Sequence, residues 1–244
     1  MRTRPLPGGA LLLTSALWQV NAIALPLGDE PVLVDSPVLP EELEALPALL
    51  RDAGLEPRAL VATHAHFDHV LAPTAFPDLP LHVGASTLAA LGDETAQQLA
   101  ESDAELYIDR ARGLSPFRAE VLDDDRFEVV AADGHAADGI ALFEPEAGIL
   151  LAGDYLIEIE IPLISEAGSP EAYLATLDRL APLVERAEVV VPGHGPALTR
   201  DRARELVDLD RRYVADLEGG PLRGPEDHRQ HRLHADNLRK HQGK

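Results

Sequence analysis

The sequence has 244 residues, no cysteine and a formal net charge of −21, from 42 acidic against 21 basic residues. This length suits one large domain with a substantial core. The acidic balance argues against a nucleic-acid partner, because binding phosphates needs a basic face. Without cysteine the chain has no disulfide framework and no thiol ligand, which is compatible with the cytoplasm, the location we predict.

The N-terminal region alternates short apolar runs with polar residues. Arg2 and Arg4 precede an apolar run at 10–13 and so imitate a secretion signal, but polar residues from Thr14 onward interrupt it. The pattern favours strands at 10–14, 17–25 and 31–35 instead. No stretch approaches the roughly 20 apolar residues that a membrane span needs, so we predict no membrane partner.

The next region predicts a helix and a buried strand. Leucines at helical spacing predict a helix over 40–52, which Gly54 ends. The apolar run at 59–62 reads as a buried strand. Farther along, 81–83 predicts a short strand and 86–102 one or two helices. His82 is a lone histidine on an apolar strand, and we do not count it as a ligand.

Three histidines and an aspartate follow the strand at 59–62 within six residues, as His64-Ala65-His66-Phe67-Asp68-His69. In a helix His64 and His66 would point about 200° apart around the axis. On extended chain, residues i and i+2 face the same way. Imidazole and carboxylate groups suit zinc, iron, manganese or nickel, and no serine or cysteine nucleophile lies nearby. The stretch therefore predicts a metal-binding loop at a strand end.

The C-terminal half repeats this arrangement of strand ends. It predicts strands at 126–132, 140–143, 149–151 and 188–191, with a helix at 169–184 that begins at Ser169-Pro170 and another at 199–217 capped by Thr199. Three further ligand types stand at the ends of strand-like runs, namely His135, Asp154 and His194. Loops of a layered α/β fold can converge at such ends.

Three segments carry weaker signals. Residues 93–123 read as an insertion, either a wall of the substrate pocket or a helical excursion that covers the sheet edge. Residues 157–164 alternate isoleucine with glutamate and predict either an edge strand with one buried face or an apolar wall of the substrate pocket. The tail at 221–244 is basic and rich in histidine, and we expect it to be a frayed, solvated helix or a flexible, disordered segment outside a domain at 1–220.

The chain resembles the metallo-β-lactamase superfamily. The run from His64 to His69 is similar to its H-x-H-x-D-H signature, and the remaining ligand types follow in the order of that family. The resemblance implies an α/β fold, a four-layer αββα sandwich of the metallo-β-lactamase type. It also implies two divalent metal ions, zinc first with iron or manganese as alternatives: one on His64, His66 and His135, a second on Asp68, His69 and His194, and Asp154 bridging.

The constellation predicts a metallo-hydrolase acting on a small molecule. A metal-bridging hydroxide would cleave an ester-, thioester- or lactone-type bond, and Asp68 would serve as ligand and catalytic residue. Glyoxalase II-like thioester hydrolysis is one alternative, although those enzymes append a helical domain that binds glutathione. A mononuclear iron persulfide dioxygenase is another, but such enzymes place an arginine after the bridging-type aspartate, and 157–165 contains none. The sequence leaves the scissile bond, the metal identity and the oligomeric state open.

Overall fold

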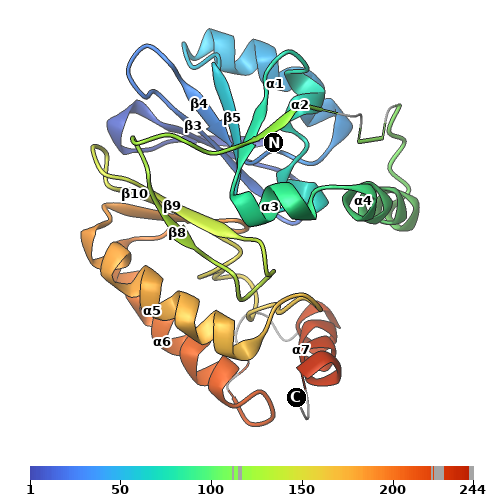
Figure 1. Ribbon diagram of the computed structural model, residues 1–244, viewed down its shortest axis with the longest axis vertical. Helices are drawn as coiled ribbons and strands as arrows, with labels where there is room; N and C mark the ends of the chain where they lie inside the picture. Colours follow the sequence, from blue (N-terminus) through green and yellow to red (C-terminus); the bar gives the residue numbers. More distant parts are fainter. Residues whose placement is uncertain (112, 115–116, 221, 223–227, 242–244) are drawn as a thin grey trace. The chain divides into compact units, whose positions relative to one another are not determined.

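The computed structural model describes residues 1–244 except 112, 115–116, 221, 223–227 and 242–244. The chain divides into two compact units, Met1–Arg126 and Phe127–Lys244, each built on one β-sheet with helices (Figure 1). Within the described part of the chain, no helix has the length and apolar character needed to cross a membrane.

The first unit contains a seven-stranded sheet. Its strands follow one another in chain order across the sheet: β1 Arg2–Pro5, β2 Leu11–Thr14, β3 Asn21–Leu25, β4 Val32–Val34, β5 Ala59–Ala62, β6 Leu81–Val83 and β7 Ala119–Val121. The pairs from β1 to β4 are antiparallel, and the pairs from β4 to β7 are parallel. The carboxyl ends of β4 and β5 therefore meet at one edge, where ligands of α/β sheets commonly bind.

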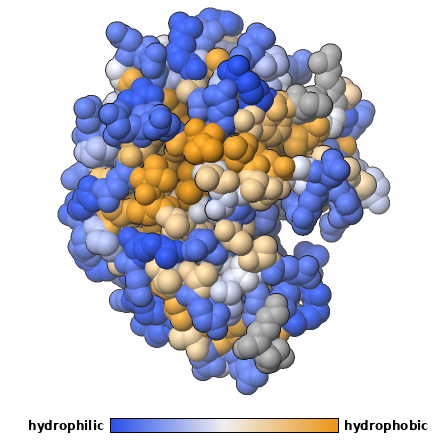
Figure 2. Space-filling model, in the orientation of Figure 1, coloured by the Kyte–Doolittle hydropathy of each residue, from blue (hydrophilic) through white to orange (hydrophobic). Residues whose placement is uncertain are grey.

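The first unit also contains helices. Their bounds are Pro7–Gly9 for the 3₁₀ helix η1, Pro40–Asp52 for α1, Phe67–His69 for the 3₁₀ helix η2, Ala72–Ala75 for α2, Ala85–Ala90 for α3 and Asp93–Leu106 for α4. Leu46 and Leu50 of α1 lie in one buried cluster with Leu33 and Leu60 of the strands. This confirms the helix predicted at 40–52. The exposed surface of α4 is mostly hydrophilic (Figure 2).

The region expected as an insertion at 93–123 contains α4 and β7. Strand β7 pairs with β6, so its residues extend the sheet. Arg110 lies next to Asp103 and also donates to the carbonyl oxygen of Val38. Arg112, Ser115 and Pro116 lie outside the described residues. A contribution of this region to a substrate pocket stays a prediction.

The second unit contains a four-stranded sheet and three helices. Across the sheet the strands are β11 Val189–Pro192, β10 Ile149–Gly153, β9 Ile140–Glu144 and β8 Glu128–Ala131, and the helices are α5 Pro170–Arg186, α6 Arg200–Ala215 and α7 His228–His241. Helices α5 and α6 lie side by side along one face of the sheet (Figure 1). Ser169 and Thr199 accept hydrogen bonds from the third amide of these helices, as their predicted capping roles require.

Two segments of this unit differ from expectation. Residues 157–164 form no strand, and Glu160, expected on an exposed face, is only 4% exposed because it pairs with Arg229. The tail forms α7, whose Gln230 and Asn237 are buried, which differs from the solvated tail that its composition suggested. Polar side chains can be buried when the backbone satisfies their hydrogen bonds. The division at residue 220 stays a prediction.

Glu42 of α1 binds the loop between β2 and β3. Because its pKa is shifted, the stability that these contacts give to the fold depends on pH. Its carboxylate accepts hydrogen bonds from Ser15 Oγ at 2.6 Å and Ala16 N at 2.8 Å. Burial alone would raise the pKa of Glu42, but these hydrogen bonds hold it below its ordinary value of 4.5. A lowered folded pKa stabilises the protein above the unfolded pKa, and the effect is lost as pH falls through the folded value.

We expect Glu42→Gln to lower the free energy of unfolding by about 1–3 kcal/mol at pH 7, because a buried acceptor loses its charge. The difference from the unsubstituted protein should shrink as the pH falls below the ordinary pKa of glutamate. Denaturant titrations at several pH values measure this, with exposed Glu44→Gln on the same helix as the control. A difference that stays constant down to pH 3 would contradict the assigned pKa shift.

Candidate metal centre

The loop after β5 gathers the ligand types predicted in the first unit. His64 Nε2 lies 3.1 Å from His66 Nδ1, and the rings of His64 and His69 have centroids 4.3 Å apart. Two nitrogens on one tetrahedral zinc ion, each at 2.0–2.1 Å, would lie about 3.3 Å apart. The spacing of His64 and His66 therefore suits two ligands of one ion. Asp68 Oδ2 lies 3.8 Å from His69 Nε2 in the same loop.

Asp35 and Thr63 orient two of these imidazoles from behind. Asp35 follows β4 with a positive φ of 58°, a conformation that aspartate tolerates better than most residues. Its Oδ1 accepts from Thr63 N at 2.8 Å, and its Oδ2 accepts from Thr63 Oγ1 and His69 Nδ1 at 3.0 Å each. Because a carboxylate only accepts, His69 carries its proton on Nδ1.

The same reasoning applies to His64. Thr63 gives its hydroxyl proton to Asp35, so Thr63 Oγ1 accepts from His64 Nδ1 at 3.1 Å. His64 and His69 then both present an unprotonated Nε2, which is the form a metal ion requires.

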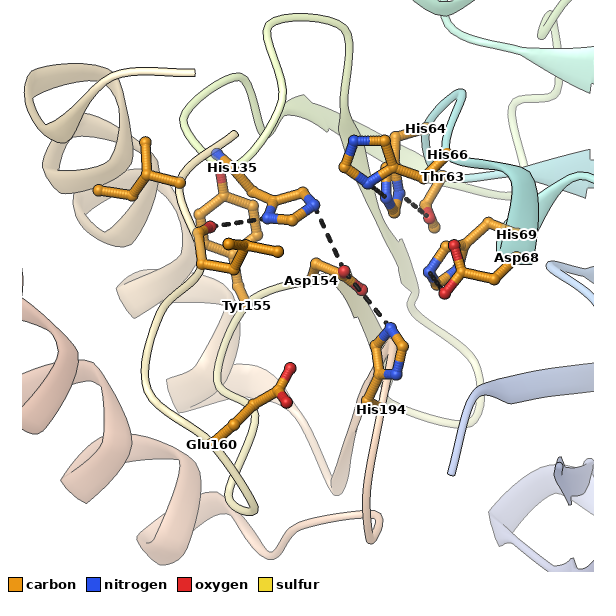
Figure 3. A network of polar contacts seen from close by, with 12 residues as sticks. Thr63, His64, His66, Asp68, His69, His135, Asp154, Tyr155, Glu160 and His194 are labelled. Atoms are coloured by element: carbon orange, nitrogen blue, oxygen red, sulfur yellow. Dashed lines mark hydrogen bonds and ion pairs between the residues drawn. The ribbon is translucent and has the colours of Figure 1, made fainter. Parts of the chain in front are cut away.

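In the second unit, three ligand types meet at strand ends. Asp154 follows β10 and His194 lies just beyond β11, and these strands are parallel neighbours. Asp154 Oδ2 lies 3.3 Å from His135 Nε2 and 3.5 Å from His194 Nε2 (Figure 3). All three side chains are buried. One carboxylate thus faces two imidazoles, as a ligand shared between two ions would.

His135 is held by its backbone and by its ring. The amides of Gly134 and His135 both donate to Tyr155 Oη at 2.7 Å, and His135 Nδ1 donates to the carbonyl oxygen of Leu163 at 2.7 Å. Nδ1 of this ring therefore carries a proton, and Nε2 is the nitrogen that faces Asp154. A Cβ on Gly134 would lie 2.1 Å from Cα of Tyr173, so only glycine allows this close approach.

Tyr155 has a structural position. Its side chain is 1% exposed, and burial raises the pKa of Tyr155 to about 12, which keeps its hydroxyl protonated. The buried hydroxyl supports the His135 loop through the amides of Gly134 and His135.

Two arginines contact the segment after Asp154, although the sequence of that segment contains none. Arg202 of α6 pairs with Glu158 at 2.6 Å, and Arg229 of α7 pairs with Glu160 at 2.7 Å. Each cation therefore lies beside a carboxylate, which compensates its charge.

The structure brings the predicted ligands together within each unit: His64, His66, Asp68 and His69 in the first, and His135, Asp154 and His194 in the second. Sequence reasoning missed Asp35, Thr63 and the Leu163 carbonyl. Asp35 carried a usable signal, because it ends the strand predicted at 31–35, and Thr63 directly follows the strand predicted at 59–62. The seven predicted ligand residues fit a site for divalent metals, because imidazole and carboxylate groups bind such ions well.

The family model described as the metallo-beta-lactamase superfamily matches residues 16–194. The chain belongs to this superfamily. Its curated relatives include the acyl-coenzyme A thioesterase MBLAC2 of Bos taurus, 28% identical over 73% of this chain and 72% of that protein. The hydroxyacylglutathione hydrolase of Rhodobacter capsulatus is 32% identical over 84% of this chain, which spans 66% of that protein.

Solved structures agree with the superfamily fold. The crystal structure of TTHA1623 in a di-iron-bound form is 29% identical, covers 80% of this chain and 97% of that one, and has a TM-score of 0.64. The metallo-beta-lactamase family protein TTHA1429 from Thermus thermophilus is 24% identical, covers 86% of this chain and 81% of that one, and shares the fold with a TM-score of 0.66. The predicted fold class and the predicted enzyme class, a metallo-hydrolase with unspecified substrate, are confirmed.

We expect Asp35→Asn to weaken metal binding roughly 10–100-fold, the usual effect of losing a partner behind a ligand. Asparagine tolerates the positive φ of this position, but its amide cannot accept all three hydrogen bonds that the carboxylate accepts. Competition with a chromophoric chelator measures the affinity, and exposed Asp78→Asn serves as the control. Unchanged affinity in Asp35→Asn would show that Asp35 does not orient the ligands.

Proposed function

We propose that this superfamily member is a dinuclear metal-dependent hydrolase with seven metal ligands. His64, His66 and His135 would hold one ion, Asp68, His69 and His194 the second, and Asp154 would bridge them. The observation that carries the proposal is the hydrogen bonding behind the proposed ligands, which places a proton on Nδ1 of His64, His69 and His135 and so makes Nε2 the nitrogen that would bind metal. The assignment of residues to ions rests on the superfamily resemblance.

The bound ions would supply the reactive water and the Lewis acid, since two divalent cations lower the pKa of a shared water toward 7 and polarise a carbonyl oxygen. Zinc is the proposed metal, because its preferred ligands are those present here. Iron is the alternative, and TTHA1623 was solved in a di-iron-bound form. Asp68 would be the catalytic residue, accepting a hydrogen bond from the attacking water and so directing its lone pair toward the substrate.

A thioester of a small molecule is the proposed substrate class. MBLAC2 is named an acyl-coenzyme A thioesterase, and a second relative is named a hydroxyacylglutathione hydrolase. The sequence alone placed ester, thioester and lactone bonds on an equal footing, so these relatives supply the preference. We retain the cytoplasm as the proposed location because the chain contains no cysteine.

For metal content, we expect about two divalent ions per chain, because the seven proposed ligands are those of a two-metal site. The full chain should be used, since α7 packs on the second unit. His135→Ala and His194→Ala should each lower the stoichiometry toward one, whereas exposed His231→Ala on α7 should not. Elemental analysis after dialysis measures this, and one tightly bound iron with oxygen consumption would indicate the dioxygenase instead.

Thioesters should be hydrolysed faster than matched oxygen esters and lactones of the same acyl group when release of the leaving group limits the rate, because a thiolate leaves more easily. Initial rates with each series, in parallel with a phosphodiester, measure the preference. A clear preference for lactones would keep the hydrolase proposal but reject the thioester. Turnover of the phosphodiester alone would reject both.

Asp68→Asn should lower kcat roughly 10²–10⁴-fold with little change in KM, the range expected for a group that acts on a proton in the transition state. The amide keeps the volume of the side chain but loses the charge that orients the water. Steady-state kinetics and metal content should be measured on the same sample. Near-normal kcat with both metals bound would show that Asp68 is not the catalytic residue.

A further inference from the structure

The segment between Asp154 and α5 forms no helix or strand at 157–165, yet it contains the acceptor that orients His135. This acceptor is the carbonyl oxygen of Leu163, on the peptide group that joins Leu163 to Ile164. An irregular segment has no neighbouring strand to fix its peptide groups. The direction of this carbonyl must therefore be set by other contacts.

Two side-chain amides of α7 supply such contacts. Gln230 accepts from Ile161 N at 3.0 Å and donates to the carbonyl oxygen of Ile159 at 2.9 Å. Asn237 accepts from Ile164 N at 3.0 Å and donates to the carbonyl oxygen of Pro162 at 2.6 Å. The two residues lie about two helical turns apart and so share one face of α7. Each amide thus pairs with the segment as a neighbouring strand would.

Asn237 contacts the peptide group that matters for His135. Its Oδ1 accepts the N–H of Ile164, and the carbonyl of that same peptide group accepts His135 Nδ1. Because a peptide group is planar and trans, its N–H and C=O bonds point in opposite directions. Holding the N–H with Asn237 therefore aims the carbonyl at His135. Hydrogen bonding at the N–H also polarises the carbonyl and makes it a stronger acceptor.

The environment of Asn237 fixes this orientation. Its side chain is fully buried at 0% exposed, and Nδ2 donates both to Pro162 O and to Tyr213 Oη at 3.0 Å. Only one assignment of the amide oxygen and nitrogen satisfies these partners, since an N–H must face an acceptor. Tyr213 is itself buried in the core that α6 forms with the sheet. Asn237 is thus anchored to the body of the second unit.

We propose that Asn237 is a positioning residue for His135: through the Leu163–Ile164 peptide group it holds a proton on Nδ1 of His135, so that Nε2, the nitrogen that faces Asp154, is the one that would bind metal. The inference rests on the ligand role proposed for His135. Helix α7 then belongs to the architecture of the metal centre, in contrast to the separate tail expected from its composition. Gln230 docks the same helix but holds a different part of the segment.

The test compares Asn237→Leu with Gln230→Met, which replace each amide by an apolar side chain of similar size. Each substitution removes two hydrogen bonds between α7 and the segment, but only Asn237→Leu releases the Leu163–Ile164 peptide group. In metal-free protein labelled with ¹⁵N-histidine, two-bond proton–nitrogen correlations report the tautomer of His135, with its signals assigned by their loss in His135→Gln.

We expect His135 to carry the Nδ1 proton in the unsubstituted protein and in Gln230→Met, and to populate the Nε2–H form in Asn237→Leu. The affinity for the ion that His135 binds should fall roughly 10–100-fold in Asn237→Leu alone. The affinity for the ion that His194 would bind should stay within about twofold of the value for the unsubstituted protein. The contacts that run from Asn237 through the Leu163–Ile164 peptide group to His135 do not include His194.

Three results would overturn the positioning role. One is an Nε2–H form of His135 in the unsubstituted protein, a measurement that remains valid if Asn237→Leu fails to fold. Another is Asn237→Leu with unchanged tautomer and affinity. The third is an equal loss in Gln230→Met, which would assign the effect to docking of α7 as a whole. If the tautomers behave as expected but His135→Ala loses no metal, the positioning role stands and the proposed ligand set fails.

Discussion

An imidazole can bind a metal ion only through a nitrogen that carries no proton, and most of the site depends on this constraint. Neutral histidine has two forms of similar energy, so the protein must select one. Here the selection is made by an acceptor behind Nδ1: Thr63 Oγ1 for His64, Asp35 for His69 and the Leu163 carbonyl for His135. Folding of each unit therefore fixes the orientation of its proposed ligands through contacts within the protein.

The parallel strand pairs explain why these groups come together within each unit. Parallel neighbours end at the same edge of a sheet, so residues that follow them become neighbours as well. Asp35 and Thr63 meet because β4 and β5 are parallel, and Asp154 and His194 meet because β10 and β11 are parallel. The backbone leaves the extended conformation at two of these strand ends, with a positive φ at Asp35 and at Gly153, where glycine adopts it without strain.

The predictable features were those with a local signal. The ligand types, the strand ends and the caps at Ser169 and Thr199 could all be read from short stretches of sequence. The segment at 157–164 was assigned the wrong structure, because its alternation of isoleucine and glutamate looks like a strand while Glu160 is buried against Arg229. The sequence did not predict that α7 packs on the segment at 159–164. The contacts are made by the polar side chains of Gln230 and Asn237, so the helix shows no periodic pattern of apolar residues.

The three acceptors behind the histidines differ in strength, and this difference bears on the role of α7. A carboxylate draws the Nδ1 proton more strongly than a hydroxyl or a neutral carbonyl, and so makes the opposite nitrogen a better donor to metal. His69 has a carboxylate directly, and His64 reaches the same carboxylate through Thr63. His135 has only a peptide carbonyl. The N–H of that peptide group donates a hydrogen bond to Asn237, which makes the Leu163 carbonyl a stronger acceptor. The difference in acceptor strength between this carbonyl and the carboxylate of Asp35 is therefore smaller. The weakest of the three acceptors is thus the one whose peptide group receives support from outside its own segment.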